Sequence, residues 1–178
     1  MEFDLEQSVS VLRNTPSVLR ALLRDMSEPM ARSNYGPNTF SPLDVIGHLI
    51  HGERTDWIPR ARIILEQGPD RPFDPFDPTA TYDQGMGATI GETLTLFETL
   101  RAENLAALKA MSLSSELLDR QGTHPEFGPV TLRELLATWT VHDLHHIAQI
   151  CKAMSHQYHD AVGPWSAYLS ILRRPARA

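Results

Sequence analysis

The feature that most constrains the fold is a long segment, residues 131–155, with a strong helix start and a continuous apolar stripe. Thr131 and Glu134 match a capping box, in which two side chains satisfy backbone N–H groups at the start of a helix. Leu135, Trp139 and Ile150 follow at helical spacing and share one face. Because such a stripe must be buried against other elements, the segment predicts one member of a packed helical core.

Three other long segments show apolar residues at helical spacing, and a short helix is expected near the end of the chain. The long segments cover residues 3–26, 42–67 and 89–111, and the short one opens at Pro164. Ser41 and Pro42 mark the start of the second segment, and Gly68 marks its end. Proline cannot donate a helical hydrogen bond, so we expect a break or kink at Pro16 and a kink at Pro59.

Four long helices in 178 residues, without a convincing alternating strand, predict an all-α protein. The expected architecture is an antiparallel four-helix bundle with a short C-terminal helix. We expect one domain over residues 1–178. Two connections, residues 68–87 and 112–130, are expected as loops. The first is rich in proline and aspartate, and the second contains His124; both are candidates for the walls of a pocket.

The composition excludes several classes of protein. The formal net charge is -6, whereas a nucleic-acid binder or a membrane-surface protein of the basic type needs an excess of positive charge. No apolar run approaches the roughly 20 residues that span a bilayer. The N-terminal residues lack the pattern of a secretory signal. With the single cysteine Cys151, no intramolecular disulfide can form, which fits a reducing compartment. We therefore expect a soluble, cytoplasmic protein.

Histidines gather on the apolar faces of two of the expected helices. His142 and His146 lie four residues apart, so they share the face of Leu135 and Trp139. His48 lies in the apolar stripe of the second helix. Metal sites in bundles are built from inward side chains on facing helices, and three imidazoles leave coordination positions open. The pattern predicts a metal site, and the alternative is a set of buried histidines satisfied by hydrogen bonds.

Several neighbours compete with these histidines or limit what they can do. His51 is the rival of His48, and His145 lies at the flank of the stripe as a bystander or a support for the ligands. A fourth protein ligand from His51 or Glu53 would close the site and favour a structural metal. Asp143 follows His142, so the zincin pattern H-E-x-x-H is absent. We expect Asp143 to point away from a metal and to form either a salt bridge or a contact that supports a metal ligand.

Two stretches resemble a known family. "FSPLDVIGHLIHGE" is similar to the segment that opens the second helix of the DinB/YfiT-like proteins, and "HPEFGPVTLRELLATWTVHDLHHIAQI" is similar to their second hallmark. The resemblance implies a four-helix bundle with a divalent metal held by His48, His142 and His146. It also implies zinc or nickel as the usual metal, with iron or other ions as alternatives, and a homodimer. Members with assigned activity include transferases and isomerases that use a low-molecular-weight thiol such as bacillithiol or mycothiol.

The leading hypothesis is a metal-dependent enzyme of the transferase or hydrolase type that acts on a small molecule, with a thiol as a candidate co-substrate. The ion would activate a bound water or thiol, or polarise a substrate oxygen. No catalytic acid or base is identified. The alternative is a non-catalytic stress-response or binding protein of the same fold, with a structural metal or none. A plain bundle with core histidines is the third hypothesis.

Overall fold

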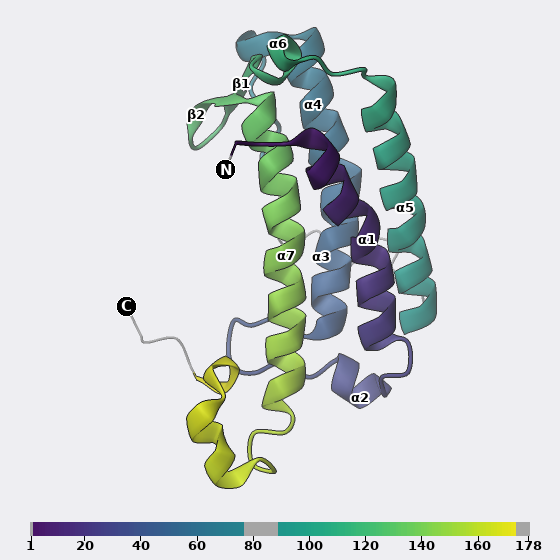
Figure 1. The fold of residues 1–178 in the computed structure, drawn as a ribbon, viewed down its shortest axis with the longest axis vertical. Coiled ribbons are helices and arrows are strands. Elements are labelled where there is room, and N and C mark those ends of the chain that lie inside the picture. Colours follow the sequence, from purple (N-terminus) through teal and green to yellow (C-terminus); the bar gives the residue numbers. More distant parts are fainter. Residues whose placement is uncertain (1, 77–88, 174–178) are drawn as a thin grey trace.

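A computed structural model describes residues 2–76 and 89–173 of the chain. Four long helical rods lie side by side (Figure 1). They are α1 (Leu5–Leu23), α3 (Pro42–Thr55) continued by α4 (Trp57–Glu66), α5 (Ile90–Ala110) and α7 (Leu132–His156), with a short α2 (Glu28–Ala31) between the first two. Helix α1 packs against α5 and α7, and α3 packs against the same two helices. The predicted all-α four-helix bundle is confirmed.

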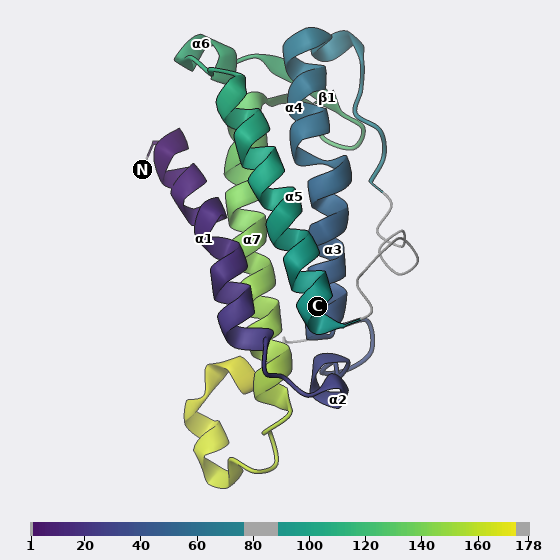
Figure 2. The same cartoon turned by 90° about the vertical axis from the view of Figure 1, so that its right-hand side faces the viewer.

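The helices alternate in direction with one exception. Helix α7 runs opposite to α3, whereas α3 and α5 run in the same direction, as Figure 2 shows by the positions of their ends. Helix α4 ends at one end of the bundle, and α5 begins at the other end, where α3 also begins. Consecutive helices of a bundle need not be antiparallel when a long connection separates them.

The helix starts read from the sequence are present. Ser41 accepts a hydrogen bond from the backbone N–H of Asp44, and the Asp44 carboxylate accepts one from Ser41. Thr131 and Glu134 form the same reciprocal pair at the start of α7. Each capping box satisfies N–H groups that have no partner inside the helix, which fixes where α3 and α7 begin.

Helix α1 is continuous, so the prediction of a break at Pro16 is wrong. Pro16 has no N–H to donate to the carbonyl of Leu12, four residues earlier. Instead, the guanidinium of Arg101 from α5 donates to that carbonyl at 2.8 Å. The tertiary hydrogen bond replaces the missing helical one, and this lets the helix pass through the proline.

The helix is interrupted near Pro59, as predicted, and the segment is divided into α3 and α4. The helices meet at Asp56, whose backbone leaves regular helical geometry at φ -102° and ψ -72°. Pro59 cannot donate to the carbonyl of Thr55, so the hydrogen-bond ladder is interrupted there. Gly68 follows α4 with φ +67°, in the left-handed region that glycine adopts without strain.

A β-hairpin stands where the sequence predicted only a loop. Strand β1 (Gln121–His124) pairs antiparallel with β2 (Gly128–Thr131), after a short helix α6 (Ser115–Leu118). The strands are too short to show the alternation that reveals a strand. The hairpin packs closely on α4, because a Cβ added at Gly122 would lie 2.6 Å from Cγ1 of Ile64. The hairpin lies beside the upper end of the bundle in Figure 1.

The short helix expected beyond α7 is present, and it is of the 3₁₀ type. Its turns span Gly163–Tyr168 and Ser170–Leu172, and they lie beyond the end of the bundle in Figures 1 and 2. Trp165 and Tyr168 on these turns are largely exposed. Within the described residues, none of the helices has the length and apolar character needed to cross a bilayer.

The interior has two apolar clusters with a polar layer between them. Along α7, Trp139 belongs to one cluster and Ile150 to the other. Along α5, Leu108 belongs to the cluster of Trp139, and Phe97 belongs to the cluster of Ile150. Between these positions the helices place the buried polar side chains, of which Glu53, Arg101, Asp143 and His146 are the main ones. The candidate site lies in this layer.

Candidate metal centre

Three imidazoles from two helices converge in the polar layer. His48 on α3 and His142 on α7 place their Nε2 atoms 3.0 Å apart, and His146 on α7 places its Nε2 atom 3.1 Å from that of His142. One nitrogen from each of the three lies within 4.8 Å of the other two. His146 is buried, and the other two are half-buried. The structure thus brings together the three histidines selected from the sequence.

Gln149 determines which nitrogen of His146 faces its neighbours. Nδ1 of His146 lies 2.7 Å from Oε1 of Gln149, one turn along the same helix. An amide oxygen only accepts, so Nδ1 carries the proton and the Nε2 of the neutral ring presents a lone pair to His142. Such a contact from the far nitrogen is what orients a metal-binding histidine.

The cluster has the protonation state that a metal ligand needs. Burial, together with the neighbouring histidines, lowers the pKa of His48 to about 4 and that of His142 to about 2. Burial also lowers the pKa of His146 to about 4, opposed in part by its hydrogen bond to Gln149. All three rings are therefore neutral near pH 7, and neutral imidazole is the form that binds metals.

Hydrogen bonds among the described residues do not complete this cluster. The Nδ1 atoms of His48 and His142 are buried without a partner there. Nε2 of His142 lies next to Nε2 of His48 and Nε2 of His146, and at least one of these two neighbours presents a lone pair. Zinc binds imidazole nitrogens at about 2.1 Å, so two nitrogens that share one ion lie within about 4.2 Å of each other, as the pairs at 3.0 and 3.1 Å do. The donor set and its spacing therefore fit a divalent cation.

The rival histidines lie outside the cluster. The ring of His51 packs against Phe76, with centroids 4.8 Å apart. His145 is exposed at the flank, with its ring centroid 5.2 Å from that of His146. Neither belongs to the group of three that the structure brings into range of one ion.

Glu53 and Asp143 belong to a separate buried network centred on Arg101. The guanidinium donates to both oxygens of Asp143, at 2.6 and 2.9 Å, and to Glu53 at 2.8 Å. Asn104 and Trp139 also donate to the Glu53 carboxylate. Of the two roles expected for Asp143, the salt bridge is confirmed, and Glu53 is held by these donors rather than by the histidines.

A cavity of about 350 Å³ adjoins the histidine cluster. His48 and His142 line one side of it. Its other described walls are mainly aromatic and apolar, namely Trp57, Phe73, Phe76, Phe127, Val130 and Leu135. As expected, the stretch after Gly68 and the segment around His124 both contribute walls, although residues 77–87 of the expected loop lie outside the described residues. The cluster therefore has one side open to a space of small-molecule size.

Sequence reasoning missed a buried ion pair in the wall of this cavity. Asp56 and Arg60 lie one turn apart at the start of α4, with 2.9 Å between Oδ1 and Nη2. Burial raises the pKa of Asp56, and Arg60 partly offsets that rise. The i, i+4 spacing was visible in the sequence, but the position of the pair in the wall of a cavity depends on tertiary structure.

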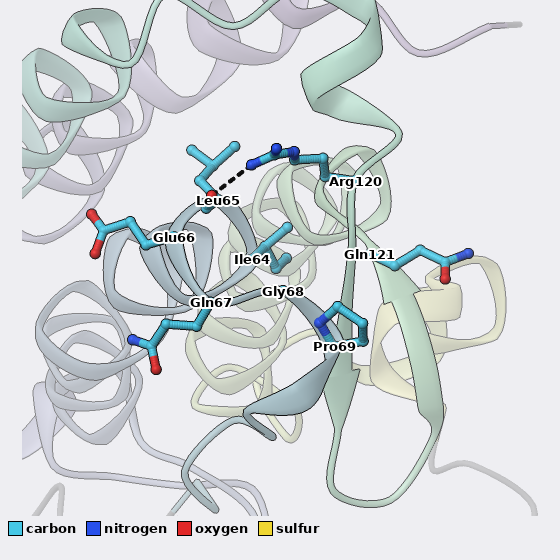
Figure 3. Close-up of a pocket in the computed structure, with 8 residues that line it drawn as sticks. All are labelled: Ile64, Leu65, Glu66, Gln67, Gly68, Pro69, Arg120 and Gln121. Atoms are coloured by element: carbon cyan, nitrogen blue, oxygen red, sulfur yellow. Dashed lines mark hydrogen bonds between the residues drawn. The ribbon is translucent and has the colours of Figure 1, made fainter.

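A second hollow lies at the far end of α4. It is lined by residues 64–69 together with Arg120 and Gln121, and Arg120 donates to the carbonyl of Leu65 at 2.6 Å (Figure 3). None of its lining residues is a histidine or belongs to the cavity beside the cluster. We assign it no part in the candidate site.

The fold and the cluster define a helical-bundle protein with an interior three-histidine site suited to a divalent metal. A family model of the DinB superfamily matches residues 12–150. The chain therefore belongs to the DinB superfamily, and the resemblance found in the sequence is confirmed.

Two relatives agree with this placement. A protein of Oceanobacillus iheyensis that carries the provisional name of a metal-dependent hydrolase is 22% identical over 147 residues, which cover 82% of this chain and 83% of that protein. The solved structure of YfiT from Bacillus subtilis has 22% sequence identity and a TM-score of 0.74, and the match covers 86% of this chain and 87% of that one. YfiT is reported as a probable metal-dependent hydrolase with an unusual four-helix bundle topology. At this identity the structural match shows a shared fold.

Proposed function

We propose that the protein is a metal-dependent enzyme of the hydrolase type that acts on a small molecule. The observation that carries the proposal is the convergence of three neutral imidazole nitrogens beside a cavity. His48, His142 and His146 would hold the ion. The names of the relatives, which refer to metal-dependent hydrolases, support the same class of reaction.

The ion, when bound, supplies Lewis acidity and lowers the pKa of a water or thiol attached to it. Gln149 keeps the lone pair of His146 directed inward. The network of Arg101 anchors α7 at Asp143, next to His142, and anchors α3 at Glu53. The aromatic walls shield the substrate from water, which strengthens polar interactions inside the cavity.

The finer assignments of the proposal follow the resemblance. They are zinc or nickel as the metal, a low-molecular-weight thiol as a candidate co-substrate, a cytoplasmic location, a single domain over residues 1–178, and a homodimer. Exposed apolar side chains support the homodimer, because Val141 and Leu144 on α7 lie on the outer face of the bundle. A non-catalytic binding protein of the same fold is the alternative, and the open cavity favours the enzyme.

Elemental analysis of the purified protein tests the metal site. We expect one divalent ion per chain in the wild type and none in His142→Ala. His51→Ala and His145→Ala are the matched controls and should keep the metal. A wild type that stays metal-free after incubation with zinc or nickel would contradict the proposal.

Turnover tests the reaction class once metal content is known. The metal-loaded protein is screened with neutral esters and amides, and separately with a cellular thiol and an electrophile. Hydrolysis that disappears in His142→Ala supports the hydrolase. Transfer only in the presence of a thiol would shift the assignment to the transferase, and no turnover in either screen would favour the binding protein.

A further inference from the structure

His124 lies at the end of β1 and lines the cavity beside the histidine cluster. Its ring stacks on Phe127 with centroids 4.4 Å apart, and it meets the edge of Phe73 at 6.1 Å. The imidazole is therefore held between two aromatic rings that line the same space. This placement comes from the hairpin, so it is independent of the helices that carry His48 and His142.

The turn of the hairpin fixes the tautomer of His124. The backbone N–H groups of Glu126 and Phe127 both donate to Nδ1 of His124, at 3.1 and 3.3 Å. A nitrogen that accepts hydrogen bonds carries no proton, so the neutral ring has its proton on Nε2. The turn thus leaves His124 with one N–H donor at the atom farthest from the backbone.

The charged side chains in the described walls of the cavity already form an ion pair or hydrogen bonds within the protein. Asp56 is paired with Arg60 at 2.9 Å, and both are buried. The Glu134 carboxylate accepts from the backbone N–H and the hydroxyl of Thr131, at 2.7 and 2.9 Å. An anionic substrate would find no unengaged positive side chain in these walls. The aromatic surface and a neutral N–H donor suit an uncharged molecule.

We propose that His124 is a substrate-binding residue whose Nε2–H donates to the carbonyl oxygen of a small, uncharged ester or amide with an apolar or aromatic group. This inference deepens the proposed function by naming its substrate class, and it rests on that function for turnover. The donor holds the carbonyl oxygen in the cavity, and the aromatic walls contact the apolar group. Binding itself requires no chemical step.

Two isosteric replacements separate the two nitrogens of the ring. In His124→Asn, the side-chain oxygen takes the place of Nδ1 and keeps the acceptor for the turn, but no donor reaches the cavity. In His124→Gln, the amide nitrogen takes the place of Nε2 and keeps a donor, but the acceptor for the turn is lost. If the role of His124 lies in the cavity, His124→Asn should be impaired more than His124→Gln. If its role lies in the hairpin, His124→Gln should be impaired more than His124→Asn.

The experiment titrates zinc-supplemented protein with benzamide, an uncharged carbonyl probe, while NMR follows the imidazole nitrogens of His124. We expect the Nε2–H tautomer, a shift of Nε2 on addition of benzamide, and about tenfold weaker binding in His124→Asn, as the loss of one hydrogen bond implies. His124→Gln should bind within about threefold of the wild type and have a lower melting temperature. The Nδ1–H tautomer, equal binding by His124→Asn, or no benzamide binding would overturn the inference.

These readouts separate this inference from the proposed function. Zinc content and hydrolysis of p-nitrophenyl acetate, compared between wild type and His142→Ala, test the metal enzyme. The tautomer and the benzamide titration test His124 without turnover. A zinc-dependent esterase in which His124→Asn keeps full activity and full benzamide binding would preserve the function and refute the role of His124.

Discussion

Two buried polar clusters lie on the same pair of helices and differ in how far the protein completes their hydrogen bonds. Around Arg101, both oxygens of Asp143 and both oxygens of Glu53 receive donors, and only the guanidinium Nε lacks a partner in the described residues. Around His142, three imidazole nitrogens face one another, and two Nδ1 atoms are buried without partners.

The difference assigns different roles to the two clusters. Buried polar groups in stable proteins are almost always paired, so the Arg101 network, in which both carboxylates are fully paired and only Nε lacks a partner among the described residues, is part of the framework. The histidine cluster lacks partners for two of its nitrogens and adjoins a cavity. A divalent cation would accept lone pairs from all three Nε2 atoms, which hydrogen bonds among neutral imidazoles do not achieve.

The largest effect is expected from breaking the completed cluster. Arg101→Met leaves the carboxylates of Glu53 and Asp143 buried together and frees the carbonyl of Leu12. We expect the free energy of unfolding to fall by about 4 kcal/mol, as removal of one partner from a buried ion pair does. Urea denaturation followed by circular dichroism measures it.

The control for this prediction is Arg20→Met, which breaks an exposed pair with Glu98. We expect a change within about 0.5 kcal/mol there, since exposed ion pairs contribute little. Equal losses in the two variants would show that the Arg101 network does not anchor the fold.

The second largest effect on the free energy of unfolding is expected when zinc binds to the histidine cluster. A ligand that binds only the folded state at a free concentration 100 times its dissociation constant stabilises that state by about 2.7 kcal/mol. Zinc at such a concentration should therefore raise the wild-type unfolding free energy by about that amount. His142→Ala should show no gain, and His145→Ala should behave as the wild type. Equal stabilisation of all three proteins would place the bound zinc elsewhere.

The sequence was sufficient for the parts of the molecule that depend on local rules. Capping residues located α3 and α7, and helical spacing placed His142 and His146 on one face with His48 on a facing helix. Their role as metal ligands remains a prediction. The hairpin was missed because two four-residue strands carry no periodic signal.

Other features depend on contacts between distant segments and could not be read locally. Pro16 is accommodated because Arg101, 85 positions later in the chain, donates to the carbonyl that the proline leaves free. The pair Asp56 and Arg60 lies in the wall of a cavity whose other walls come from distant segments of the chain. Near both positions a proline removes a helical hydrogen bond, and contacts with distant segments determine the structure that forms there.

The third effect concerns the charge state of the metal-free histidine cluster. The pKa of His142 in the fold, about 2, is below its usual value of 6.5. Between these values the unfolded chain binds a proton that the folded chain does not, so stability falls as pH falls below 6.5. Between pH 6.5 and 5 the loss from one such histidine is about 2 kcal/mol.

Urea denaturation at several pH values, applied to chelator-treated wild type and His142→Gln, measures the direction and size of this loss of stability. The wild type should lose more stability on acidification than the variant, and the two should differ little in slope above pH 7. Parallel curves throughout would mean that His142 titrates normally, in which case the cluster is more open to water than its burial indicates.

The smallest effect concerns Gln149, which alone among the described residues forms a hydrogen bond to the Nδ1 side of a ring in the histidine cluster. Gln149→Leu removes the acceptor for Nδ1 of His146, so the ring is less firmly oriented and less basic at Nε2. We expect the zinc dissociation constant to rise about tenfold, in the range found for supporting residues at metal sites. Gln149→Glu keeps an acceptor and adds negative charge, so its zinc affinity should equal or exceed that of the wild type. Competition with a chromophoric chelator measures both. Equal affinity in the two variants would show that the cation is held without help from Gln149, and the contrast between the clusters would then rest on the three imidazoles alone.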